Sequence, residues 1–236
     1  MKSPSEMPHA GASAHWEHMW AGGLAKGQAF DVGKPSQALV GALARMERPV
    51  AGSSALVAGA GRGYDAIALA AHGFDRVVSL DLSATACAAA QALLKEETDD
   101  PAAAARVEVV CGDFFEHKGA YECIWDCTFL CALDPSVRER WSRQQRALLA
   151  PKGQLITCVF PIIDKVGGPP YAMSVDLVTD LLVPAGFTMV ECNEDLPDEQ
   201  QHRPGGAGSF GSKTTAIAVW RAVTFGGFGM GLGRGA

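Results

Sequence analysis

A glycine-rich turn followed by an acid is the part of this chain whose residue types and spacing most clearly suit chemistry. Gly59, Gly61 and Gly63 follow one apolar run, and Asp81 ends the next apolar run. Glycines let the backbone approach a ligand where a Cβ atom would clash. An acid about 20 residues after the glycines suits the hydroxyl pair of a ribose. The pattern predicts a site for an adenosine-containing cofactor.

The glycine spacing separates two kinds of cofactor. A dinucleotide site needs Gly-x-Gly-x-x-Gly, so that a pyrophosphate rests on the helix N-terminus. Here Gly63 comes one residue early, and Asp65 follows in the first turn of the next predicted helix. An acid at this place repels a pyrophosphate but accepts a hydrogen bond from the ammonium group of an amino acid. The spacing therefore favours S-adenosylmethionine over a nicotinamide dinucleotide.

Residues after the second and third predicted strands complete the predicted cofactor site. Leu82, next to Asp81, is assigned to it. Asp113 and Phe114 follow the third strand, where the acid can accept from the adenine amine and the ring can pack on the base. The alternatives are that Asp113 caps a loop turn and that Asp81 caps a helix.

An aromatic segment near the N-terminus offers a place for methyl transfer. Trp16 and Trp20 lie one helical turn apart and can present one aromatic face to a sulfonium cation, and Phe30 can close over the methyl group. The alternative is a hydrophobic arm that only packs on the core. Asp31 either contacts a substrate proton, orders the arm or caps a helix that begins at Pro35.

The composition limits the classes of function. The 236 residues suit one α/β domain, and the net charge of −6 disfavours a nucleic-acid or membrane-surface binder. No apolar run reaches the length of a membrane span or signal peptide, and an odd number of cysteines suggests reduced thiols in the cytoplasm. The spacing of Cys123, Cys127 and Cys131 invites a metal site, but a strand running into a loop does not bring them together, so no metal is predicted.

Strand-like and helix-like patterns alternate along the chain and must position these motifs. Predicted strands cover 54–58, 76–81, 106–111, 121–126, 154–160, 187–193 and 213–221, and predicted helices cover 35–46, 63–72, 84–97, 136–149 and 174–183. This order predicts an α/β fold with a mostly parallel seven-stranded sheet, helices on both faces and an antiparallel C-terminal edge strand.

The remaining segments set the predicted domain boundaries. Residues 15–222 form a single domain, of which 15–48 provide the aromatic lid and a helix. Residues 15–34 are too irregular for a simple helix. Residues 1–14 are predicted to be a flexible arm, and 223–236 a flexible glycine-rich tail.

Several longer motifs resemble the thiopurine/thiol methyltransferase family, and most closely its halide/thiol (thiocyanate) methyltransferase branch. The resemblance covers about residues 15–222 and rests on Trp16 to Pro35, Gly59 to Asp65, Trp125 to Leu133, Phe160 to Ile162 and Gly167 to Tyr171. It implies a class I methyltransferase (Rossmann-like) fold, S-adenosylmethionine as cofactor and S-adenosylhomocysteine as product. The family's cofactor positions carry over onto Trp16, Trp20, Gly59, Asp81, Asp113, Phe114 and Cys127.

Two departures from the family concern the methyl acceptor. Cys127 stands at a position that looks like an arginine in thiopurine methyltransferases. This difference argues against large aromatic thiols as substrates. Arg203 to Gly206 lacks the glutamate of the Arg-x-Gly-x-Glu pattern of the halide/thiol branch. Tyr171 follows a stiff turn, Gly168 to Pro170, and is predicted to hydrogen-bond a small anion or thiolate, the alternative being a tyrosine that plugs the sheet edge.

The reaction implied is an in-line displacement by a thiol, bisulfide, thiocyanate or halide. A thiolate or halide brings its own charge, so alignment and exclusion of water suffice without a strong base. The chain is expected to act as a monomer on a small molecule, without nucleic acid or membrane. Competing hypotheses are an arsenical or heterocyclic-thiol methyltransferase, a cofactor-binding scaffold without catalysis, and a nicotinamide oxidoreductase.

Overall fold

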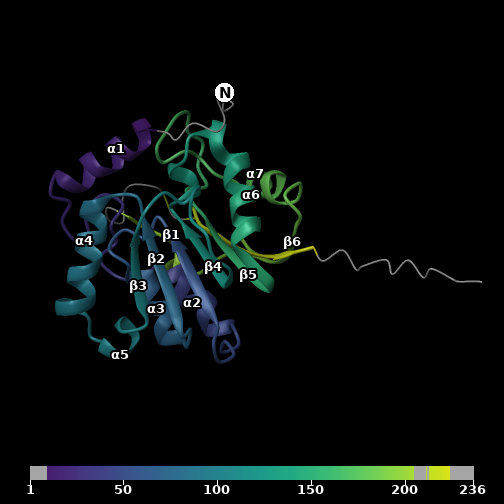
Figure 1. Cartoon of the computed structure of the whole chain (residues 1–236). Coiled ribbons are helices and arrows are strands. Elements are labelled where there is room, and N and C mark those ends of the chain that lie inside the picture. Colours follow the sequence, from purple (N-terminus) through teal and green to yellow (C-terminus); the bar gives the residue numbers. More distant parts are fainter. Residues whose placement is uncertain (1–9, 205–210, 212, 224–236) are drawn as a thin grey trace, which may run out of the picture.

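A single seven-stranded sheet carries the molecule (Figure 1), and the computed structural model describes residues 10–204, 211 and 213–223. The strands lie in the order β3-β2-β1-β4-β5-β7-β6. Their bounds are β1 Ser54–Ala58, β2 Arg76–Asp81, β3 Val107–Cys111, β4 Tyr121–Cys127, β5 Leu149–Val159, β6 Phe187–Asn193 and β7 Ala216–Ala222.

The sheet confirms the predicted fold. Strand β1 pairs in parallel with β2 and β4, and β4 pairs in parallel with β5. Strand β7 is antiparallel to both of its neighbours, β5 and β6. Strand β6 forms the edge of the sheet. The last strand, β7, lies between β5 and β6, one position inside that edge.

Helices cover both faces of the sheet (Figure 1). One core contains Leu39 and Leu69, from the neighbouring helices α2 and α3, and the other contains Trp141 and Leu182, from α6 and α7. Burial on both faces explains why the strands are apolar throughout. The helices are α1 Ala10–Ala21, α2 Gln37–Arg45, α3 Tyr64–His72, α4 Ala84–Ala92 with a π-helical continuation Leu93–Glu97, α5 Pro101–Ala104, α6 Arg138–Leu148 and α7 Val175–Leu182.

Local residue types set the helix ends next to the glycine turn. Gly63 precedes α3 with a φ of +83°, and Gly73 ends it with a φ of +124°, a left-handed region that favours glycine. Ser83 caps α4, because its hydroxyl accepts a hydrogen bond from the backbone N–H of Ala86 at 3.0 Å. Both helices therefore begin directly after a strand, at the carboxyl edge of the sheet.

Helix α1 corrects the expectation that residues 15–34 are too irregular for a simple helix. It covers Ala10–Ala21, and the predicted boundary of the flexible arm at residue 14 falls inside it. The hydrophobic pattern is weak because polar contacts hold this helix beside α4. Glu17 accepts hydrogen bonds from the hydroxyls of Ser83 at 2.7 Å and Thr85 at 2.5 Å.

The rest of the predicted arm and tail, residues 1–9 and 224–236, lies outside the described residues. None of the helices in the described part of the chain has the length and apolar character that crossing a membrane requires.

Candidate active site

The glycine turn and Asp81 meet at the carboxyl edge of the sheet. Gly59 and Gly61 have φ values of +62° and +54°, which favour glycine. The Asp81 carboxylate accepts from the backbone N–H of Gly61 at 2.8 Å and of Ser83 at 2.9 Å. Burial raises the pKa of Asp81, and these two hydrogen bonds oppose the rise. Because Ser83 caps α4, the alternative that Asp81 serves as a helix cap does not hold.

The surroundings of Asp81 fit an adenosine. The two carboxylate oxygens together have more lone pairs than these backbone hydrogen bonds use, and the remaining ones can accept from ribose hydroxyls. The neighbouring Leu82 is 36% exposed and offers apolar surface to a base. These two residues are the parts of this edge that fit S-adenosylmethionine most directly.

Asp113 and Phe114 lie at the end of β3, next to this edge. One Asp113 oxygen accepts from the backbone N–H of Phe115 at 2.8 Å, so the turn-capping alternative is realised in the structure. Phe114 is 4% exposed and meets the ring of Phe129 edge-to-face, at 5.0 Å between centroids. Contact of these two residues with an adenine stays a prediction.

The aromatic segment comes together over the glycine turn. Trp16 and Trp20 both meet Phe30 edge-to-face, with centroid distances of 5.5 and 5.7 Å. Trp20 is buried, and a Cβ atom built at Gly61 would lie 3.1 Å from its Cζ2 atom. Helix α1 and the loop after it therefore form an aromatic lid that contacts the glycine turn through Trp20.

Arg62 ties this lid to the turn, and the sequence analysis missed it. Its Nε atom lies 2.6 Å from a carboxylate oxygen of Asp31, and its guanidinium carbon lies 5.3 Å from the ring centroid of Trp20. Asp31 also accepts from the N–H of Gly33 at 2.7 Å. Asp31 thus orders the lid. It does not cap α2, whose N-cap residue is Ser36. The cation that contacts the Trp20 ring in this structure is the guanidinium of Arg62.

Asp65 has a structural role that its spacing did not reveal. Its two carboxylate oxygens accept from the backbone N–H of Ser36 at 2.7 Å and from Nε1 of Trp125 at 2.6 Å. Burial raises its pKa. The carboxylate predicted to face an ammonium group is therefore already used to join the start of α2 to β4.

Cys127 ends β4 in a buried cluster. It lies beside Cys158 in the sheet register, and its Sγ atom is 3.8 Å from Nδ1 of His202. The neighbouring Cys158 thiol and burial raise the pKa of Cys127 well above its usual value, so this thiol is neutral at pH 7. His202 is 5% exposed and was missed, because no motif marks its loop. No group of three His, Cys, Asp or Glu among residues the structure describes is arranged to hold a metal.

The loop after β4 connects the glycine turn to Tyr171. A Cβ atom built at Gly59 would lie 2.6 Å from Cδ2 of Phe129, so the phenyl ring sits directly on that glycine. The residue before it, Thr128, has a φ of +58°, and such backbone strain in a β-branched residue is typical of functional sites. Two residues after Phe129, the backbone carbonyl of Cys131 accepts a hydrogen bond from the N–H of Tyr171 at 2.8 Å. Tyr171 is thereby held near the cofactor edge.

The family follows from comparison with known sequences. The family described as Thiopurine S-methyltransferase (TPMT) matches residues 11–219. The chain belongs to this family. It is an S-adenosylmethionine-dependent methyltransferase, as the resemblance implied.

Known relatives agree with this assignment. A protein named "Probable thiol methyltransferase 2", from Arabidopsis thaliana, is 37% identical over 182 residues, which cover 76% of each chain. "Thiocyanate methyltransferase 1" from Brassica oleracea is 33% identical over 192 residues, or 80% of each chain. The fold matches the solved structure of 1,6-didemethyltoxoflavin-N1-methyltransferase from Burkholderia thailandensis with a TM-score of 0.64 and 21% identity, over 95% of this chain and 94% of that one.

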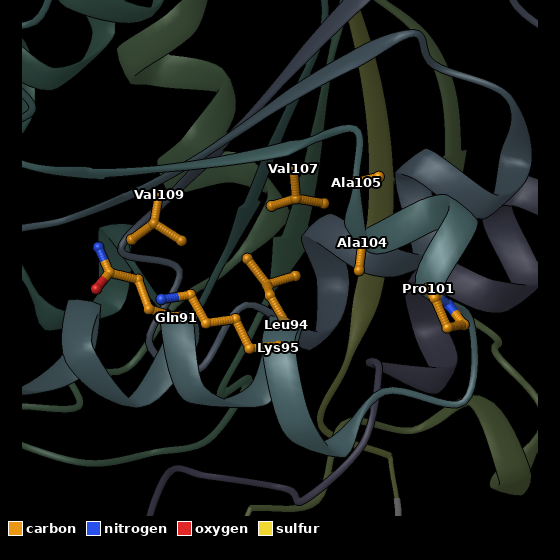
Figure 2. A pocket seen from close by; sticks show the side chains of 8 residues that line it. All are labelled: Gln91, Leu94, Lys95, Pro101, Ala104, Ala105, Val107 and Val109. Carbon is orange, nitrogen blue, oxygen red and sulfur yellow. The ribbon is translucent and has the colours of Figure 1, made fainter.

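A cavity of about 500 Å³ lies elsewhere on this methyltransferase (Figure 2). Leu94, Val107 and Val109 line it between the end of the α4 segment and the edge strand β3, with the stem of Lys95 at its rim. It includes none of the predicted site residues. It therefore lies apart from the predicted cofactor site.

The Arg62–Asp31 pair should control how firmly the lid closes. We expect Arg62→Met and Asp31→Asn each to weaken S-adenosylhomocysteine binding about 10-fold, because each leaves a buried charge without its partner. The double variant should bind no worse than the weaker single variant, since both remove the same interaction. Calorimetric titration measures the three affinities. Arg76→Met, which breaks the exposed pair with Glu108, is the control. Additive losses would contradict the lid assignment.

Proposed function

We propose that this methyltransferase acts on a small, soft nucleophile: a thiol, bisulfide, thiocyanate or halide. The relatives named thiol and thiocyanate methyltransferases support the thiol and thiocyanate part of this range. The observation that carries the proposal is the packing of Trp20 onto Gly61 within a cluster of the Trp16, Trp20 and Phe30 rings. A lid this close to the cofactor edge suits small acceptors and keeps water out.

The predicted residues around the glycine turn and Tyr171 have roles that fit their places. S-adenosylmethionine, when bound, supplies a methyl group on a positively charged sulfur. Asp81 and Leu82 hold its adenosine, and Gly61, which has no Cβ atom, leaves room for the Trp20 ring of the lid. The lid excludes water, which would otherwise solvate the attacking anion. Tyr171 orients the acceptor by donating its hydroxyl hydrogen to the nucleophile. Cys127 is a small, neutral group at the family position of an arginine and makes room without adding charge.

Tyr171→Phe tests the acceptor role of the hydroxyl. We expect kcat/KM for thiocyanate and bisulfide to fall about 10- to 100-fold, since a hydrogen bond to a charged group is lost. The affinity for S-adenosylhomocysteine should stay within about threefold. Initial rates with headspace or mass detection of the product provide the measurement. Tyr121→Phe removes a buried hydroxyl at the other end of β4 and is the control. Unchanged rates in Tyr171→Phe would leave this tyrosine with a purely structural role.

A panel of nucleophiles tests the proposed function as a whole. Thiocyanate, bisulfide, iodide, an aryl thiol and an arsenical are incubated in parallel with labelled S-adenosylmethionine. Methylated thiocyanate, bisulfide or iodide supports the proposal. Turnover of the aryl thiol or arsenical alone favours the alternative acceptors. Cofactor binding without any methylated product would indicate a non-catalytic scaffold.

We further propose that the enzyme works as a monomer in the cytoplasm. The seven unpaired cysteines, of which five are buried, support the compartment, because such thiols persist in a reducing environment. Light scattering of the purified protein measures its molar mass, and a dimer would contradict the monomer.

A further inference from the structure

Arg138, the first residue of α6, is a buried cation with free hydrogen-bond donors. It is 8% exposed. Its Nε and Nη2 atoms are buried and have no hydrogen-bond partner among the described residues. No carboxylate in the described part of the chain forms an ion pair with it. A buried charge without a partner is costly, so this arrangement suits a site that an anion completes.

The two free donors have the geometry of an anion-binding fork. In a planar guanidinium the Nε and Nη2 hydrogens point the same way and are spaced to meet two oxygens of one carboxylate. A carboxylate fills both donors with separate oxygens, whereas a halide offers a single atom. The fork therefore recognises an oxyanion such as a carboxylate better than a halide.

Arg138 lies beside Tyr171, the residue that we propose orients the acceptor. Its guanidinium carbon is 5.2 Å from the ring centroid of Tyr171. The N–H of Tyr171 is bonded to the carbonyl of Cys131, two residues after Phe129, whose ring sits on Gly59. One loop thus connects the glycine turn, Tyr171 and Arg138.

The other groups near Arg138 do not fill its fork. Burial lowers the pKa of Arg138, and the nearby Tyr171, Cys131 and Asp134 oppose that shift. The Asp134 carboxylate accepts from the N–H and hydroxyl of Ser136, at 2.9 and 2.6 Å. Burial raises the pKa of Cys131, so this thiol is neutral at pH 7. Neither group supplies the pair of oxygens that the fork would meet.

We propose that Arg138 binds a carboxylate carried by the methyl acceptor, so that the preferred acceptors are thiols bearing a carboxylate. The inference rests on the proposed function and narrows its substrate class. A mercapto acid whose thiol and carboxylate are a few bonds apart reaches both the Tyr171 hydroxyl and the Arg138 fork. Arg138 then fixes the position of the sulfur without touching it.

The kinetic test compares mercaptopropionate with its neutral amide, mercaptopropionamide. The wild-type enzyme should prefer the acid about 10-fold or more in kcat/KM at a pH that gives both thiols the same ionised fraction. Arg138→Gln should raise KM for the acid about 10- to 100-fold and change KM for the amide less than about threefold. Arg138→Lys keeps the charge but not the fork, so its KM for the acid should lie between those of the wild type and Arg138→Gln. Arg143→Gln, at an exposed position of the same helix, is the matched control.

A binding measurement tests the inference without turnover. Methylthiopropionate, the methylated product, is titrated by calorimetry into the protein saturated with S-adenosylhomocysteine. Wild type and Arg143→Gln should bind it alike, and Arg138→Gln about 10-fold or more weakly. Unchanged S-adenosylhomocysteine affinity in Arg138→Gln shows that the variant is folded. If it does not fold, Arg138→Lys takes its place, with a smaller loss expected.

The outcomes separate this inference from the proposed function. Equal losses for acid and amide, a loss for thiocyanate as large as for the acid, or tight product binding by Arg138→Gln would each overturn the carboxylate site. In those cases turnover of thiocyanate or the amide by the wild-type enzyme still supports the proposed function. If no nucleophile is methylated at all, the proposed function fails, and the product titration decides the fate of Arg138 by itself.

Discussion

Asp81→Ala is expected to weaken S-adenosylhomocysteine binding about 100-fold while leaving the protein folded. The change removes the carboxylate that we propose as the acceptor for the ribose hydroxyls, and each hydrogen bond to a charged group contributes about 1.5–3 kcal/mol. It also leaves the N–H of Gly61 without its partner at 2.8 Å, which loosens the glycine turn. Both effects act on the same ligand and in the same direction.

Calorimetric titration measures this loss, and thermal unfolding checks the fold. Asp81→Asn keeps one carbonyl oxygen and should lose about 10-fold, because only part of the acceptor capacity remains. Asp75→Ala is the matched control, since its carboxylate accepts from the N–H of Gly52, away from the glycine turn. Affinity within about threefold of wild type in a folded Asp81→Ala protein would remove the ribose role.

Asp65→Ala is expected to lower the free energy of unfolding by about 3 kcal/mol. The substitution leaves two donors without an acceptor, the N–H of Ser36 and the Nε1–H of the fully buried Trp125, and each orphaned donor costs about 1–3 kcal/mol. Burial also raises the pKa of this carboxyl, so removing its charge returns part of that cost. The lost hydrogen bonds dominate because both donors are held rigidly, one by α2 and the other by β4.

Urea unfolding measures this loss of stability. Asp65→Asn keeps one acceptor and should lose about half as much, and Asp164→Ala, at an exposed position, should lose less than about 0.5 kcal/mol. The affinity of Asp65→Asn for S-adenosylhomocysteine tests the other role considered for this residue. We expect it unchanged, because both carboxylate oxygens already serve the protein. A 10-fold weaker affinity in a stable variant would instead support a contact with the ammonium group.

Patterns within short segments predicted much of this fold. Strands β1 and β2 were predicted at their observed bounds, since buried parallel strands are continuous apolar runs. Helix α1 was missed because its polar contacts come from distant segments: the partners of Glu17, Ser83 and Thr85, lie 66 and 68 residues away. The sequence also did not predict that β7 lies inside the sheet, because the order in which strands pair depends on contacts between distant segments.

The sequence by itself determined the strand, glycine turn and acid that suit the cofactor, because these features lie within one βαβ unit. The family motifs in turn determined the class of reaction. Only the tertiary structure decided which side chains share contacts across the chain. It joined Arg62 to Asp31, 31 residues apart, and Trp125 to Asp65, 60 residues apart. It also set Arg138 against Tyr171. No local pattern encodes such pairs, because burial and charge become costly or favourable only after the distant segments have packed together.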